Sequence, residues 1–198
     1  EAYTTIASIY KNKGKKQEAL KYLNRAIELS PNDYSLYLQR GSIYMDLENY
    51  DKTKYDYEKA LQLRPDVYST WMNVGIINSI LRNFDVAIKA FNEAVRLSPN
   101  TPDVYTNRGN YFDMTNQPEK AIEDYTKGIM FDKNNVDAYS NRAGVYYKLK
   151  MYEKALNDYN MVISKLNNNG FAFLRRSLVY QAIGDYMKEK QDIDMAIS

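Results

Sequence analysis

The sequence predicts an all-α solenoid, a chain of short helix-turn-helix repeats stacked one on the next. Pro31, Pro65 and Pro99 stand 34 residues apart, and the residues around each of them recur with the same spacing. A period of this length is typical of repeat proteins in which each unit buries its apolar face against its neighbours. Large and small apolar residues also alternate at helical spacing, as expected where helices interlock.

Six copies of this frame fit the chain when each proline is placed at position 32 of a 34-residue repeat. The predicted repeats are 1–33, 34–67, 68–101, 102–135, 136–169 and 170–198. Because repeats of this kind share a continuous core, we expect them to form a single domain. The chain starts and stops within a repeat, so we also expect it to be a fragment of a longer protein, and the sequence does not define its compartment.

The first helix of each predicted repeat carries one aromatic column and one column of small residues. Position 4 holds Tyr3, Tyr37, Trp71, Tyr105, Tyr139 and Phe173. Position 8 holds Ala7, Gly41, Gly75, Gly109, Ala143 and Ser177. Small residues in such a column allow two helices to approach closely, so the two helices of each repeat should pack tightly.

The second helix carries a small column at position 20 and a large apolar column at position 24. Position 24 holds Leu23, Tyr57, Phe91, Tyr125, Tyr159 and Ile193, which we interpret as packing residues. Gly14, Gly184 and Asn116 stand at position 15, between the helices, where a left-handed turn residue is expected. Pro118 should begin a second helix, because proline is tolerated in the first turn.

These columns resemble the signature of the tetratricopeptide repeat (TPR) family, which is aromatic, small and aromatic in the first helix and Ala, aromatic, Ala, Pro in the second. The resemblance covers essentially all of the chain. It implies an antiparallel helix pair for each repeat and a right-handed superhelix, whose concave face binds a protein or peptide partner. A protein-protein interaction module is therefore the expected function.

The composition argues against several other kinds of function. The chain has no Cys and no His, so it lacks thiolate ligands and the commonest metal ligand and general base. Its 27 basic and 25 acidic residues give a formal charge of +2, and they form no stripe of the kind that a nucleic acid needs. No apolar run is long enough to insert into a membrane. We expect no enzyme activity, cofactor or metal.

A column of carboxamides at position 6 is the strongest candidate for a binding surface. Gln39, Asn73, Asn107 and Asn141 recur there, although asparagine has a poor propensity for helix interiors. A carboxamide can both donate to and accept from a peptide backbone, so one in each repeat could hold an extended chain. The alternative is that these side chains bond to neighbouring repeats or face water. The column resembles the asparagine ladder of the O-GlcNAc transferase TPR superhelix.

A second TPR pattern to consider is the two-carboxylate clamp for C-terminal peptides. Repeats four to six contain three of its residue types, Asn110, Asn141 and Arg175, but Thr106 and Phe171 stand at the two lysine positions. Without those cations most of the charge-assisted bonding is lost, so a full clamp is not expected. Arg175 remains a candidate anchor for a carboxylate or a carbonyl.

Two further expectations concern single features. Tyr147 falls at position 12, on the expected inner face, and is a candidate for lining the groove, whereas most other tyrosines fall in packing columns. The alternative function is a structural scaffold that self-associates through its last helix, where Ile193 and Ala196 have no capping helix beyond them.

Overall fold

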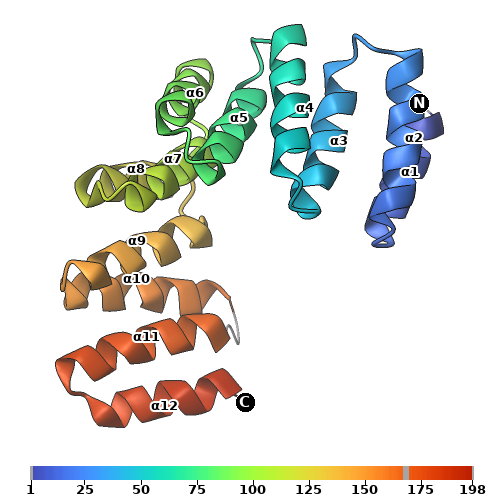
Figure 1. The fold of residues 1–198 in the computed structure, drawn as a ribbon. Helices are drawn as coiled ribbons and strands as arrows, with labels where there is room; N and C mark the ends of the chain where they lie inside the picture. The colour runs from blue at the N-terminus through green and yellow to red at the C-terminus, as the bar shows by residue number, and fades with distance from the viewer. Residues whose placement is uncertain (1, 167–169, 198) are drawn as a thin grey trace. The chain divides into compact units, whose positions relative to one another are not determined.

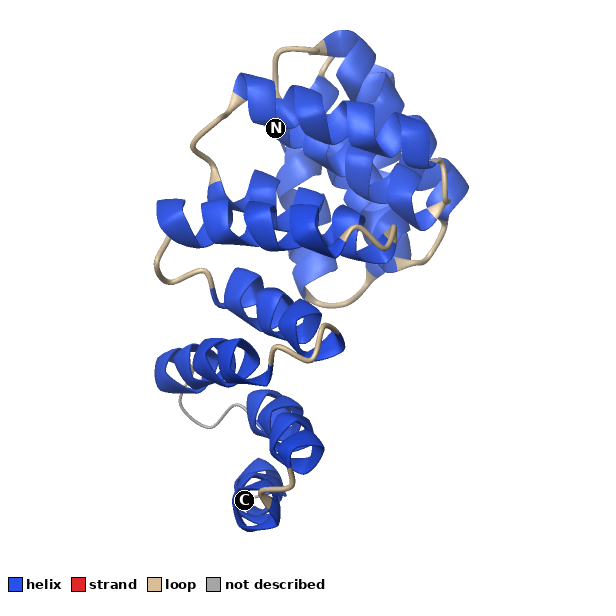
Figure 2. Ribbon diagram, turned by 90° about the vertical axis from the view of Figure 1, so that its left-hand side faces the viewer, coloured by secondary structure: helices blue, strands red, loops and turns tan. Residues whose placement is uncertain are grey.

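The described part of the chain folds into helices joined by short turns. The computed structural model describes residues 2–166 and 170–197, which contain helices and no strand (Figures 1 and 2). The helices are α1 (Ala2–Asn12), α2 (Lys16–Leu29), α3 (Tyr34–Asp46), α4 (Tyr50–Leu63), α5 (Tyr68–Ile80), α6 (Phe84–Leu97), α7 (Pro102–Met114), α8 (Pro118–Phe131), α9 (Val136–Lys148), α10 (Tyr152–Lys165), α11 (Gly170–Ile183) and α12 (Tyr186–Ile197). None of these helices is both long and apolar enough to span a membrane.

Consecutive helices pack in pairs, α1 with α2 through α11 with α12, so each predicted repeat contains one helix pair. The small column at position 8 explains how closely the paired helices approach. A Cβ atom added at Gly109 would lie 2.7 Å from a ring carbon of Tyr125, and one added at Gly75 would lie 2.8 Å from the ring of Phe91. The predicted close packing of the two helices is therefore confirmed.

The chain divides into two compact units, Glu1–Pro99 (unit 1) and Asn100–Ser198 (unit 2). In unit 1 the three helix pairs contact one another through α2 with α3 and α4 with α5. In unit 2 the corresponding contacts join α8 to α9 and α10 to α11. The expectation of one continuous domain stays a prediction.

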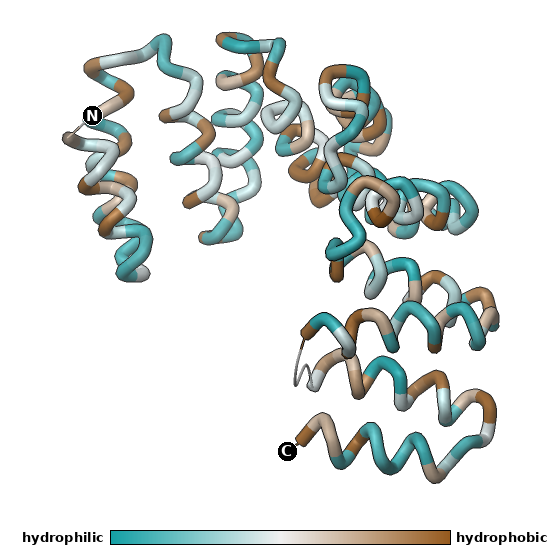
Figure 3. Tube along the Cα trace, turned by 180° about the vertical axis from the view of Figure 1, so that it is seen from behind, coloured by the Kyte–Doolittle hydropathy of each residue, from teal (hydrophilic) through white to brown (hydrophobic). Residues whose placement is uncertain are grey.

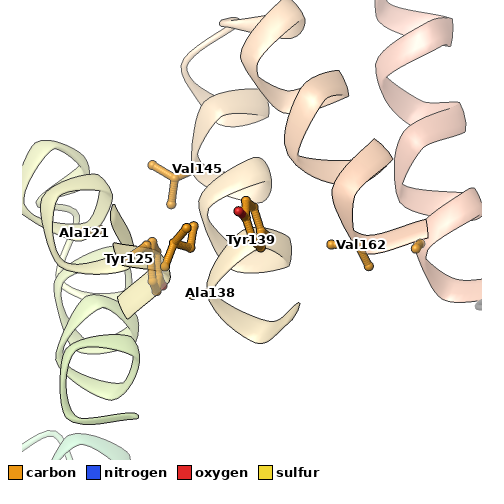
Figure 4. Packing of buried hydrophobic residues seen from close by; sticks show 8 residues of the cluster. Ala121, Tyr125, Ala138, Tyr139, Val145 and Val162 are labelled. Carbon is orange, nitrogen blue, oxygen red and sulfur yellow. The ribbon is translucent and has the colours of Figure 1, made fainter. Parts of the chain in front are cut away.

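Each unit buries its own apolar clusters. In one cluster of unit 2 the side chains converge from four successive helices, α8, α9, α10 and α11 (Figure 4). The labelled members of this cluster are Ala121, Tyr125, Ala138, Tyr139, Val145 and Val162. Hydrophobic and hydrophilic residues are interspersed along the helices (Figure 3). The core of each unit is therefore a series of small clusters between neighbouring helices.

Buried Arg–Asp pairs, which the sequence columns did not single out, join the two helices of four repeats. The pairs are Arg40–Asp56, Arg108–Asp124, Arg142–Asp158 and Arg176–Asp192. Both guanidinium–carboxylate bonds of the Arg142 pair measure 2.8 Å. Arg142 also donates through Nη1 to Thr126 Oγ1 of the preceding repeat, at 2.9 Å. Each arginine of this kind can therefore tie its own helix pair to the pair before it.

The turns between paired helices repeat one backbone conformation. Gly14, Gly184 and Asn116 have φ angles of 72°, 80° and 57°, which confirms the predicted left-handed turn residues. Glu48, Arg82 and Lys150 adopt the same conformation at the same repeat position, with φ of 55°, 60° and 59°. The backbone is strained at these three residues, because a Cβ atom disfavours the left-handed conformation. Pro118 is the first residue of α8, as predicted.

The aromatic column at position 4 connects successive repeats. Tyr37 donates its hydroxyl to the Pro31 carbonyl at 2.9 Å, and Trp71 donates Nε1 to the Pro65 carbonyl at 2.7 Å. In these two repeats the ring therefore links the first helix to the proline that ends the preceding repeat.

Candidate functional site

A hollow of about 470 Å³ opens on unit 2 over the first helices of three successive repeats. It is lined by Asn110, Asp113 and Met114 of α7, Tyr125 of α8, Ser140, Asn141, Gly144 and Lys148 of α9, Tyr159 of α10, and Phe171 and Arg175 of α11. Three of the residues predicted from the sequence, Asn110, Asn141 and Arg175, thus line one hollow. We call it the unit 2 groove.

Two asparagines bond directly to each other across the groove. Asn141 Nδ2 on α9 donates to Asn110 Oδ1 on α7 at 2.8 Å, and the Tyr125 hydroxyl donates to the same oxygen, also at 2.8 Å. The Asn110 oxygen therefore has both of its acceptor sites occupied. The two side chains still offer a ligand the Asn110 amide hydrogens as donors and the Asn141 oxygen as an acceptor.

Two buried tyrosine rings form the floor of the groove. Tyr125 and Tyr159 are 1% and 3% exposed, so only their hydroxyl ends can meet a ligand. Burial raises the pKa of Tyr125, and the nearby Asp113 and Asp124 carboxylates raise it further. Burial also raises the pKa of Tyr159, against the opposing effect of Arg175. Both hydroxyls are therefore neutral donors at physiological pH.

Gly144 keeps the floor of the groove open. A Cβ atom placed on this residue would lie 3.9 Å from the Tyr159 hydroxyl. In the preceding repeat the same position holds Asn110, and in the next it holds Leu178. The absence of a side chain at this point leaves space above the second tyrosine.

The charged residues of the groove have different partners. Lys148 Nζ lies 2.8 Å from both carboxylate oxygens of Asp113, which joins α9 to α7 at the rim. The Arg175 guanidinium instead lies 4.8 Å from the centre of the Phe171 ring, and it forms no ion pair with any carboxylate that the structure describes. Stacking on the ring restrains this side chain while its N–H groups remain available.

Two predicted residues of unit 2 do not line the groove. Asn107 Nδ2 donates to the Asp103 carbonyl one turn earlier in its own helix, at 2.8 Å. The Tyr147 ring packs against Tyr152, with 6.1 Å between ring centres, at the edge of a buried cluster. Their roles in binding stay predictions.

The two predicted residues of unit 1 lie on α3 and α5. Gln39 lines a separate small hollow of about 170 Å³, together with Ser8 and Lys11. Asn73 is half-buried, and its side chain makes no hydrogen bond to any residue within the described ranges. The four carboxamides of the predicted ladder therefore have four different environments, and a continuous ladder stays a prediction.

Several groove residues escaped the sequence analysis. Tyr125 and Tyr159 were assigned to a packing column, and their rings do pack, but their hydroxyl ends reach the groove. The sequence contained one indication of this, because position 24 holds tyrosine in repeats four and five, although phenylalanine fills the same position in the third repeat, as Phe91. Gly144 gave a second signal, because it follows the expected small residue Ala143 and is not needed for packing there.

The last helix exposes a number of apolar side chains. Tyr186, Met187 and Ile197 of α12 are 70%, 85% and 79% exposed. Ile193, which the sequence analysis singled out, is 39% exposed. Self-association through this helix stays a prediction. Within residues 2–166 and 170–197, no group of three or more acidic side chains is placed to hold a metal ion.

Comparison with known proteins supports one family over residues 1–171. The family model for the cytochrome c-type biogenesis protein H TPR domain matches residues 58–171. Two tetratricopeptide repeat models match residues 1–33 and 34–67. A search of curated proteins finds no match.

Solved structures with low sequence identity share the fold. PilW, described as a widely conserved type IV pilus biogenesis factor, is 17% identical with a TM-score of 0.89, over 96% of this chain and 89% of its own. PilF of Pseudomonas aeruginosa is 19% identical with a TM-score of 0.82, over 96% of this chain and 87% of its own.

A third solved structure is YrrB, described as a TPR protein with an unusual peptide-binding site. It is 19% identical with a TM-score of 0.64, over 88% of this chain and 90% of its own. These likenesses confirm the predicted fold class of an all-α repeat solenoid. Together with the family matches, they show that the chain belongs to the tetratricopeptide repeat family.

Proposed function

We propose that unit 2 binds an extended segment of a partner protein in the unit 2 groove. TPR proteins are generally protein-interaction modules and non-enzymatic scaffolds. The observation that carries the proposal is the bond between Asn110 and Asn141 above the Tyr125 hydroxyl. It holds two carboxamides from different repeats in one orientation within a hollow.

The groups that these side chains leave unbonded match a peptide backbone. The Asn110 amide hydrogens can donate to a peptide carbonyl, and the Asn141 oxygen can accept from a peptide N–H. Because the intramolecular bonds already fix both carboxamides, binding orders few further side-chain torsions. The geometry therefore favours recognition of main chain at this point, largely independent of ligand sequence.

The remaining lining adds a charged anchor and an apolar surface. Arg175 has no carboxylate partner among the described residues, so it can bond to a carboxylate or a carbonyl of the ligand. Phe171 and Met114 are 57% and 50% exposed and offer apolar surface beside it. Each hydrogen bond contributes only about 1 kcal/mol net, so the affinity requires several contacts together.

The proposal is tested with peptides selected from a random library on the wild-type chain. Their dissociation constants are then measured by fluorescence anisotropy for the double variant Asn110→Ala/Asn141→Ala. We expect affinity to fall about tenfold or more, from the loss of two bonds of about 1 kcal/mol each.

Asn157→Ala is the matched control, because Asn157 is exposed on α10 and does not line the groove. This variant should bind like the wild type. If the double variant remains folded and retains full affinity for every selected peptide, the groove is not the binding site.

The carboxamide ladder is a separate extension of this proposal. It predicts that Asn73→Ala and Asn107→Ala weaken binding of long peptides more than that of short ones, because each repeat adds one contact. Equal effects on long and short peptides would confine binding to the unit 2 groove.

A further inference from the structure

A second hollow, of about 370 Å³, lies on unit 1 and uses different helix surfaces. It is formed by α2 of the first repeat together with the end of α3 and the start of α4 of the second repeat. Its polar lining consists of Gln17, Lys21, Asn24, Tyr44, Asn49 and Lys52. We call it the α2–α4 hollow.

The oxygens of the two asparagines of this hollow each accept one hydrogen bond within the protein. Asn24 Oδ1 already accepts from Arg40 Nη1 at 2.8 Å, and Asn49 Oδ1 accepts from the Lys52 backbone N–H at 3.3 Å, as the N-cap of α4. Their amide hydrogens remain available. Each oxygen keeps one further acceptor site, so the two side chains together present more donors than acceptors to a ligand.

The cations of the hollow are also without partners of opposite charge. Neither Lys21 nor Lys52 forms an ion pair with a carboxylate in the described part of the chain, and no carboxylate lines the hollow. Lys52 Nζ lies 5.2 Å from the centre of the Tyr44 ring, which positions it at the hollow. Asp51, its neighbour in the first turn of α4, lines an adjacent hollow. The α2–α4 hollow therefore presents positive charge and N–H donors together.

The same place in unit 2 shows that the repeat frame does not impose this charge. Three repeats later, Glu119 and Glu123 stand at the positions of Gln17 and Lys21, and Met151 stands at the position of Asn49. Glu123 is paired there with Lys127 at 2.7 Å. Only the lysine above the aromatic ring is retained, as Lys154 over Tyr146. The α2–α4 hollow therefore differs in charge from the equivalent place in repeats four and five.

We propose that the α2–α4 hollow binds an acidic segment of a partner polypeptide. Aspartate or glutamate carboxylates of that segment would lie between Lys21, Lys52 and the two asparagine amides. Leu20 and Leu47 share the lining, so an apolar side chain next to the acidic residues has a surface to contact. This apolar part favours a polypeptide over a free anion. The site is separate from the unit 2 groove and does not depend on it.

The test uses a fluorescein-labelled peptide of three Glu-Glu-Leu-Gly units and the same peptide with Gln in place of Glu, measured by anisotropy at low salt. We expect the Gln peptide to bind about three- to tenfold more weakly, since Lys21 and Lys52 are exposed and each contact with an exposed cation adds only modestly to the affinity. Lys21→Glu, at an exposed side chain with no ion pair, should weaken binding to a similar degree. Adding Lys52→Gln should weaken it further.

Two control variants keep the test specific. Lys154→Gln, at the equivalent lysine of unit 2, and Asn157→Ala, at an exposed residue that lines neither hollow, should each change the affinity less than about twofold. Circular dichroism establishes that each variant is folded. Equal binding of the Glu and Gln peptides, or full affinity in folded Lys21→Glu, would overturn the proposal. Displacement of the peptide by an equimolar amount of inorganic phosphate would overturn the assignment to a polypeptide.

Discussion

The repeat 68–101 in unit 1 and the repeat 136–169 in unit 2 share one frame, but different side chains hold their helix pairs together. In the second of these, Arg142 and Asp158 form a buried pair with both bonds at 2.8 Å. In the first, Val74 and Ala90 occupy the same two positions and are 3% and 1% exposed. Both members of the pair have changed together, from ionic to apolar.

A second pair of positions also differs between these repeats. Lys154 Nζ lies 5.5 Å from the centre of the Tyr146 ring, whereas Asn78 and Val86 stand at the equivalent positions of the repeat 68–101. A buried ion pair can be exchanged for apolar residues only as a unit, because a single charge left behind is costly. The comparison indicates that the apolar and small columns define the fold, whereas different kinds of residue pair can occupy these other positions of the repeat.

The inner faces of the two repeats differ as well. Gly144 and Tyr159 border the unit 2 groove, whereas Ile76 and Phe91 occupy the equivalent positions of the repeat 68–101. A missing side chain and an added hydroxyl therefore distinguish a polar, open floor from an apolar one.

The largest predicted effect comes from breaking the ionic pair of the repeat 136–169. Asp158→Ala leaves the Arg142 guanidinium, which is 14% exposed, without its carboxylate, and should lower the free energy of unfolding by about 3–5 kcal/mol. Urea denaturation measures the change. The double variant Arg142→Val/Asp158→Ala copies the repeat 68–101 and should recover most of the loss. An equal loss in both variants would show that the paired exchange is not tolerated.

The next prediction concerns alkaline pH and compares Tyr57 with Phe91, which share position 24. Burial raises the pKa of Tyr57 to about 12, with further contributions from Asp46 and Asp56. In the unfolded chain the tyrosine hydroxyl ionises near pH 10, whereas in the folded chain Tyr57 stays neutral to a higher pH. The free energy of unfolding therefore keeps its full value below about pH 10, and the contribution from neutral Tyr57 is lost between about pH 10 and 12. It amounts to about 2–3 kcal/mol at most.

The measurement is the free energy of unfolding against pH for the wild type and for Tyr57→Phe. The wild type should lose more stability than the variant over this interval, because phenylalanine does not ionise. Parallel curves for the two proteins would contradict the assignment.

A smaller effect is expected from the groove hydroxyls. Tyr125→Phe removes the 2.8 Å bond to Asn110 and should lower the free energy of unfolding by about 1 kcal/mol. Tyr159→Phe is the control, because its hydroxyl has no hydrogen-bond partner among the described residues. Thermal melts compare the two variants. A Tyr159→Phe loss as large as that of Tyr125→Phe would mean that the bond to Asn110 adds little.

The smallest effect is expected at the turns. Lys150→Gly relieves a left-handed backbone at φ of 59° and should raise the free energy of unfolding by about 0.5 kcal/mol. Gly184→Ala, at φ of 80°, is the opposite change and should lower it by about 1 kcal/mol. Thermal melts of both variants should therefore move in opposite directions, and a shift of the same sign in both would refute the strain argument.

The sequence was sufficient to predict the fold, because side chains recur at fixed positions wherever the backbone repeats. Gly109 beneath Tyr125 and the left-handed Gly14 are examples in which residue type follows directly from local geometry. The Arg–Asp pairs were predictable too, since the same 16-residue spacing occurs in four repeats and both partners are missing together in the repeat 68–101.

The candidate site was predictable only in part. Helical periodicity is enough to bring Asn110, Asn141 and Arg175 to one face, and the structure shows that they share a hollow. Periodicity does not define rotamers, so it could not tell that Asn141 reaches Asn110 while Asn107 turns back to its own helix. Nor does it show that a buried ring such as Tyr125 presents its hydroxyl at the surface of the groove.

The most direct test of the central claim is to follow the side-chain amide signals of Asn110 and Asn141 by ¹H–¹⁵N NMR during titration with a library-selected peptide. The account predicts that both signals shift as the peptide binds, because one carboxamide donates to the ligand and the other accepts from it, while the Asn157 signal stays in place. A peptide that binds the chain and leaves the Asn110 and Asn141 signals unmoved would contradict it.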